Sequence, residues 1–90
     1  MISGKVRKVI NEAIATKTSV LITYRKEEDR SIIARKIDPY EIKIENRLRD
    51  KSNHVYIYAV DKIEPLKIKK FLAKNFISIK STEEKFSPIF

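Results

Sequence analysis

The order of apolar and polar residues along the chain changes its period once, near residue 18. Before that point apolar residues recur at helical spacing, with charged residues on the other faces: Val6, Ile10, Ala13 and Ile14. Ser3 stands where a helix N-cap is expected. The pattern predicts one amphipathic helix over residues 4–16. Its narrow apolar stripe favours packing against a sheet over packing in a helical bundle.

From Ser19 onward apolar and polar residues alternate with a period of two, which predicts strands. The expected strands are, in chain order, residues 19–25, 31–37, 40–45, 54–60, 66–72 and 76–80. The polar run 26–30 predicts an exposed hairpin turn, and Pro39 falls between two of the strands. Strand 54–60 carries bulk on both faces, so we expect it to pair with strand 40–45 in the middle of the sheet.

These elements predict an α+β, mainly β fold. We expect an N-terminal amphipathic helix packed on a small antiparallel SH3-like or Sm-like barrel of five to six strands. Ninety residues suit a single domain, 1–90, with the helix at about 4–16, the barrel at about 19–80 and a C-terminal tail at 81–90. We expect Phe86 in the tail to dock on the body of the domain.

The composition excludes most classes of enzyme. A single Gly leaves no Gly-rich phosphate loop. The absence of Cys and the presence of one His, His54, exclude a thiolate metal site, a disulfide framework and a Cys or His-based catalytic triad. Glu41 and Glu45 would lie about 13 Å apart along a strand, too far for a glycosidase pair. We therefore expect no enzyme activity, no cofactor and no metal.

The charge balance favours an anionic partner. The chain has 20 Lys and Arg against 12 Asp and Glu, a net charge of +8 at pH 7. The alternative is that a basic surface only keeps the protein in solution. No apolar run approaches the roughly 20 residues of a membrane span, and the first apolar residues are interrupted by charges, unlike a secretory signal. We expect no membrane partner and a cytoplasmic location.

The densest basic segment lies between Glu64 and Glu83 and contains no acidic residue. Its lysines are Lys67, Lys69, Lys70, Lys74 and Lys80. In one groove they would contact phosphates, and nearby aromatic side chains would offer stacking surfaces for unpaired bases: Tyr56, Tyr58 and Phe71. The alternative is an edge strand that its lysines protect from aggregation. Without a bulge, the adjacent Lys69 and Lys70 must point to opposite faces.

Several short motifs occur in the order and spacing of a WYL domain. They are residues 11–14 (NEAI), 20–24 (VLITY), 35–40 (RKIDPY) and 55–59 (VYIYA). The chain resembles the WYL family over nearly its whole length, with Val55, Tyr56 and Ile57 at the place of the Trp-Tyr-Leu signature. Downstream residues fit the family's basic-x-Phe element and the aromatic positions after it: Lys69, Phe71, Phe76 and Phe86.

The resemblance implies an Sm-like barrel that senses a ligand, such as nucleic acid or a nucleotide, in bacterial or phage-defence regulators. It places Arg35 and Lys69 at positions where the family carries basic residues. The family's Asp-Arg-Ile element appears here as residues 74–76 (KNF), so Asn75 replaces a characteristic Arg and Lys74 would act there as a point charge. WYL domains usually follow a DNA-reading domain; none precedes this one, so we expect a freestanding module.

Together these observations predict a non-catalytic regulatory or ligand-sensing module that binds an anionic ligand, with single-stranded nucleic acid or an oligonucleotide as first choice. The expected binding residues are Arg35, Tyr56, Tyr58, Lys67, Lys69, Lys70, Phe71 and Lys74. The alternative is a protein-interaction module that forms a homo-oligomer or pairs with a separate DNA-binding protein. The apolar tail residues Phe86, Ile89 and Phe90 favour that alternative.

Overall fold

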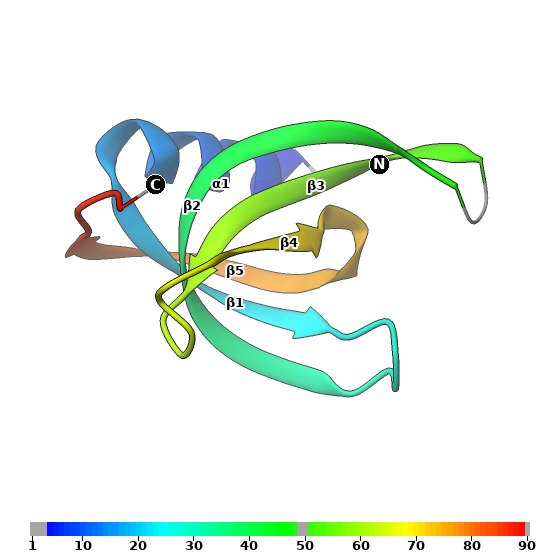
Figure 1. The fold of residues 1–90 in the computed structure, drawn as a ribbon. Coiled ribbons are helices and arrows are strands. Elements are labelled where there is room, and N and C mark those ends of the chain that lie inside the picture. The colour runs from blue at the N-terminus through cyan, green and yellow to red at the C-terminus, as the bar shows by residue number, and fades with distance from the viewer. Residues whose placement is uncertain (1–3, 49–50, 90) are drawn as a thin grey trace.

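The computed structural model describes residues 4–48 and 51–89. In this part of the chain the elements are α1 (Gly4–Thr16), β1 (Thr18–Arg25), β2 (Ile32–Arg47), β3 (Ser52–Asp61), β4 (Ile68–Leu72), the 3-10 helix η1 (Ala73–Asn75) and β5 (Phe76–Lys85). The strands form one antiparallel sheet in the order β4-β3-β2-β1-β5 (Figure 1). The predicted α+β, mainly β class is confirmed, with five strands.

Helix α1 has the predicted bounds and buries the predicted stripe. Val6, Ile10 and Ala13 are buried, and Ile14 packs beside them. The helix contacts β1, β2 and β5 and lies along one side of the strands (Figure 1). The expected N-cap, Ser3, lies outside the described residues. The helix therefore covers a sheet, as its one-sided pattern predicts.

The predicted strands 31–37 and 40–45 are one continuous strand, β2. Residues 32–37 of β2 pair with β1, and residues 37–47 pair with β3. Pro39 is buried where the pairing changes partner, and the register shifts between Pro39 and Glu41. Proline has no N–H to donate to the hydrogen-bond ladder of a sheet, and a β-bulge accommodates the missing bond. The chain therefore bends here without ending the strand, and β2 curves through the whole molecule (Figure 1).

The C-terminal part of the sheet is longer than predicted. β5 continues past Lys80 to Lys85, and Ser81 pairs with Val20 of β1. The first half of the expected tail is therefore a strand. Beyond it the Phe86 N–H donates to the Lys17 carbonyl at 2.9 Å, and the Phe86 ring lies 5.7 Å from that of Tyr40. Phe86 thus docks as expected, whereas Phe90 lies outside the described residues.

An aromatic cluster joins strands that are distant in the sheet order. The Tyr24 ring of β1 packs edge-on against Phe71 of β4 at 5.3 Å and Phe76 of β5 at 5.6 Å. The Leu72 N–H donates to the Tyr24 hydroxyl at 3.1 Å. Burial raises the pKa of that hydroxyl, so it stays protonated at neutral pH. The core thus ties β1 to β4 and β5 through a single tyrosine.

Candidate functional site

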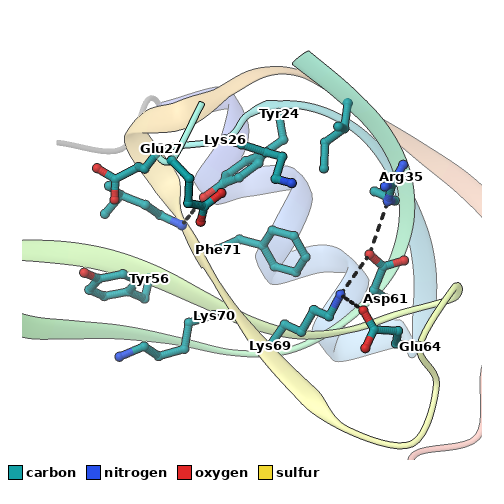
Figure 2. Close-up of a pocket in the computed structure, with 13 residues that line it drawn as sticks. Tyr24, Lys26, Glu27, Arg35, Tyr56, Asp61, Glu64, Lys69, Lys70 and Phe71 are labelled. Carbon is teal, nitrogen blue, oxygen red and sulfur yellow. Dashed lines mark hydrogen bonds and ion pairs between the residues drawn. The ribbon is translucent and has the colours of Figure 1, made fainter. Parts of the chain in front are cut away.

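The structure divides the predicted binding residues among several places. Arg35 and Lys69 face a cavity of about 410 Å³ between the β1–β2 hairpin and β4 (Figure 2). Tyr56 and Lys70 also border this cavity, but their side chains turn away from Arg35. Phe71 lies in the core, and its ring lines the cavity as well. The remaining three residues lie elsewhere: Tyr58 on the outer side of β3, Lys67 before β4 and Lys74 on η1.

Three charged residues meet at one wall of this cavity. The Asp61 carboxylate is buried, and its Oδ2 lies 3.4 Å from Arg35 Nε and 3.7 Å from Lys69 Nζ. The Ile63 N–H donates to Asp61 Oδ1 at 3.0 Å. The Arg35 and Lys69 side chains remain 31% and 28% exposed. The carboxylate therefore lies beneath two cations. The wall presents these cations to the cavity together with Glu64, whose Oε1 lies 2.6 Å from Lys69 Nζ (Figure 2).

The strand register explains why these three side chains converge. Arg35 of β2 pairs with Ile22, Asp61 at the end of β3 pairs with Ile37, and Lys69 of β4 pairs with Ala59. All three partners are core residues. Directly paired residues of an antiparallel sheet share a face, so the three charged side chains point to the inner side. Sequence reasoning missed Asp61, although it follows the core residue Ala59 by two positions.

The lysines of the basic segment do not line one groove. Lys69 and Lys70 border the cavity, whereas Lys67 and Lys80 border two different surface hollows. Lys69 and Lys70 contact different carboxylates, Glu64 at 2.6 Å and Glu45 at 2.9 Å, and extend in opposite directions (Figure 2). The expectation that these two neighbours point to opposite faces is thus met.

Carboxylates from other elements neutralise much of this segment. Glu64 pairs with Lys69 and also with Lys67, at 3.2 Å, and these two contacts lower the pKa of Glu64. Among residues 4–48 and 51–89, no carboxylate lies within ion-pair distance of Lys74 or Lys80. The acid-free stretch of sequence is therefore not an acid-free surface.

The predicted stacking residues are already in contact with other side chains. The Tyr58 hydroxyl donates to Glu45, which also accepts from Lys70. These two donors lower the pKa of Glu45, and Glu45 in turn raises the pKa of both Tyr58 and Lys70. Lys70 Nζ lies 4.8 Å from the centre of the Tyr56 ring, and Lys43 Nζ lies 5.0 Å from that of Tyr58. A stacking base would have to displace these lysines.

Phe71 is a poor stacking surface, because it lies in the core and is only 5% exposed. Its ring forms part of the cavity wall next to Tyr24 (Figure 2). Five of the eight predicted residues therefore border the cavity. Of these, Arg35 and Lys69 are the two that the fold brings together over a buried carboxylate, and Asp61 is the residue to add.

No known family model matches this chain, and no curated protein matches it either. In the described part of the chain, no three residues among His, Cys, Asp and Glu gather in a way that would hold a metal ion. The helix within those residues is too short and too polar to cross a membrane. The resemblance to WYL domains rests on the sequence motifs alone.

Proposed function

We propose that this chain is a non-catalytic, WYL-like regulatory module that binds an anionic ligand, with single-stranded nucleic acid or an oligonucleotide as the ligand. The observation that carries the proposal is the convergence of Arg35 and Lys69 over buried Asp61 in one cavity. By the resemblance, the module works in the cytoplasm, in transcriptional or defence regulation.

The chemistry of the two cations suits a phosphate group. Arg35 directs Nε to Asp61 and one terminal nitrogen to the Ala34 carbonyl at 2.9 Å, which leaves further N–H donors for a ligand. A guanidinium and an ammonium side by side provide planar and point-charge contacts to the same phosphate. The phosphate would compete with Asp61 for both cations, so Asp61 holds them in place when no ligand is bound.

The proposal includes closure of the sheet into an SH3-like or Sm-like barrel. β4 and β5 are the two edges of the sheet, and the three residues of η1 separate them in the chain. Tyr24 contacts an aromatic residue of each edge strand. Short separation and a shared core contact both favour edges that lie close together.

The test is fluorescence anisotropy with short labelled single-stranded DNA and RNA, at several salt concentrations. Lys69→Gln removes a cavity cation, and Lys74→Gln is the matched control because it removes the same charge from η1. We expect Lys69→Gln to weaken binding about tenfold, and Lys74→Gln by about twofold at most. Asp61→Asn should strengthen binding, because it removes the carboxylate that competes for both cations. Its side-chain oxygen still accepts from Ile63, and Glu64 still pairs with Lys69.

Lys69→Gln should weaken binding and Asp61→Asn should strengthen it. These opposite effects would distinguish binding at the cavity from non-specific electrostatic attraction. Equal losses for Lys69→Gln and Lys74→Gln would mean that net charge alone binds the oligonucleotide. Unchanged binding by the folded Lys69→Gln and Asp61→Asn variants would mean that the cavity is not the site. Circular dichroism melts of each variant establish that it is folded under the binding conditions.

A further inference from the structure

A second surface, on the outer side of the sheet, combines aliphatic and basic side chains. On β1, Leu21, Thr23 and Arg25 alternate with the core residues and point away from the core. We define the outer β1 face as these residues and their paired neighbours on β2 and β5: Leu21, Thr23, Arg25, Ile32, Ala34, Lys36, Ser78 and Lys80. Leu21 is 42% and Ile32 56% exposed.

The register gives this face a trough. Thr23 pairs with Ala34 on one side and Ser78 on the other, so three small side chains form one row across three strands. The next row is larger, because Leu21 lies between Lys36 and Lys80. A hollow of about 400 Å³ lies over these rows. The row of small residues therefore leaves space for side chains of another molecule.

The charge of the outer β1 face has one sign. Lys36 pairs with Glu84 near the end of β5. For Arg25 and Lys80, the described part of the chain offers no carboxylate within ion-pair distance. A partner that covers this face must therefore bring negative charge, since buried cations need partners.

The side chains of the outer β1 face also favour one class of partner over the others. It carries aliphatic side chains and no aromatic one, so bases would have nothing to stack on. A second copy of this chain that docked through the same face would oppose Arg25 and Lys80 to the same cations, and each copy carries +8. A protein segment that combines carboxylates with aliphatic side chains complements both the charge and the exposed Leu21 and Ile32.

We propose that the outer β1 face docks an acidic protein segment whose aliphatic side chains enter the trough at Thr23. The hollow of this face shares Arg35 with the Arg35–Lys69 cavity, but its other lining residues differ, and Lys69 borders the cavity only. The module thereby has two surfaces, one for a ligand and one for a protein partner.

The test uses a labelled octapeptide that alternates Glu with Val, titrated at low salt. Octapeptides that alternate Lys with Val and Glu with Ser are its controls. Ala34→Glu places a carboxylate in the trough, and Ala15→Glu on the exposed side of α1 is the matched control. We expect Ala34→Glu to weaken binding of the Glu-Val peptide about tenfold and Ala15→Glu by about twofold at most. Amide NMR shifts should map to Leu21, Thr23 and Ser78.

Three results would overturn this proposal. The first is no binding of the Glu-Val peptide at low salt, or binding no stronger than that of either control peptide. The second is a shift map that avoids the outer β1 face. The third is a dimer in light scattering that Ala34→Glu disperses, which would assign the face to a second copy. Lys69→Gln should leave peptide binding unchanged, so this proposal and the ligand site can fail separately.

Discussion

Within residues 4–48 and 51–89, three residues other than glycine have a positive φ: Lys17 at 55°, Arg30 at 64° and Lys51 at 54°. Arg30 ends the β1–β2 turn, where its N–H donates to the Lys26 carbonyl at 3.0 Å. A left-handed conformation costs an ordinary residue about 1–2 kcal/mol, and glycine loses about 0.5–1 kcal/mol more backbone entropy on folding. Arg30→Gly should therefore raise the free energy of unfolding by about 0.5 kcal/mol in urea denaturation.

The matched control is Glu28→Gly in the same turn, because Glu28 has no positive φ. There glycine adds entropy to the unfolded chain and relieves no strain, so the free energy of unfolding should fall by about 0.5–1 kcal/mol. A loss of stability in Arg30→Gly as well would mean that the arginine side chain contributes more than its backbone costs.

Single residues also show how much of the candidate site can be predicted from the sequence. Arg35 and Lys69 were predicted because they are basic at positions suggested by the resemblance. Their convergence depends on the register of β2, β3 and β4, which no local pattern specifies. Asp61 was missed because a lone acidic residue at the end of a strand resembles a turn residue. Its parity with the core residue Ala59 was the available signal.

At the scale of elements, Glu45 links three strands, because it accepts hydrogen bonds from Tyr58 of β3 and Lys70 of β4. These bonds lower the pKa of Glu45 below its ordinary 4.5. A carboxyl group with a lowered pKa in the folded state stabilises the fold above its ordinary pKa, and the contribution disappears as pH falls through the folded value. Glu45→Gln should thus be less stable than the natural chain near pH 7, and the gap should close below about pH 4.5.

Urea denaturation at a series of pH values measures how the difference in free energy of unfolding between Glu45→Gln and the natural chain changes with pH. Glu12→Gln on α1 is a suitable control, because Glu12 is exposed and the described residues offer it no ion pair. Its curve should run parallel to that of the natural chain. A gap for Glu45→Gln that stays constant down to pH 3 would show that the hydrogen bonds do not depend on the charge of Glu45.

The bend of β2 is held by a buried carboxylate next to Pro39. The Ser19 hydroxyl donates to Asp38 Oδ1 at 2.5 Å, and Lys62 Nζ lies 2.9 Å from Oδ2. Removing one member of a buried charged pair costs about 3–5 kcal/mol, and Lys62 is partly exposed, so the lower end applies. Asp38→Ala should therefore lower the free energy of unfolding by about 3 kcal/mol. A loss below about 1 kcal/mol would mean that the bend holds without this cluster.

Elements in which apolar residues recur with a regular period were predicted correctly. Elements without such a pattern were missed or given wrong bounds. The helix and the pairing of residues 40–45 with 54–60 followed from alternation and are confirmed. The continuity of β2 through Pro39 was missed, because the effect of a proline depends on the pairing around it. The strand over residues 81–85 was missed because STEEK is polar at every position, so its alternation carries no signal.

At the scale of the whole molecule, the charge that a surface presents depends on the fold and cannot be counted from one segment of the sequence. The segment from Lys67 to Lys80 contains no acid, yet Glu45 and Glu64 reach its lysines from β2 and from the loop before β4. A local count of charge therefore overestimates the field that a ligand meets. Two kinds of cation remain available to a ligand. Those of the Arg35–Lys69 cavity stay partly exposed, and others, such as Lys80, have no carboxylate partner among the described residues.

The two edges of the sheet are linked by Tyr24, whose hydroxyl accepts from the Leu72 N–H while its ring touches Phe76. Tyr24→Phe leaves that buried N–H without its acceptor, which costs about 1–3 kcal/mol. We expect hydrogen exchange of the Leu72 amide to accelerate, whereas the paired amides of β2 and β3 keep their relative protection. Native-state exchange followed by NMR measures both.

Tyr40→Phe is the control for this substitution, because its hydroxyl accepts from the Ile89 N–H in the C-terminal segment and not from an amide of β4. It should leave Leu72 exchange unchanged. If Leu72 exchanges equally fast in the natural chain and in Tyr24→Phe, the bond between β1 and β4 does not form in solution. β4 would then be held mainly by its ladder with β3, and the proposed closure of the sheet into a barrel would lose one of its supporting contacts.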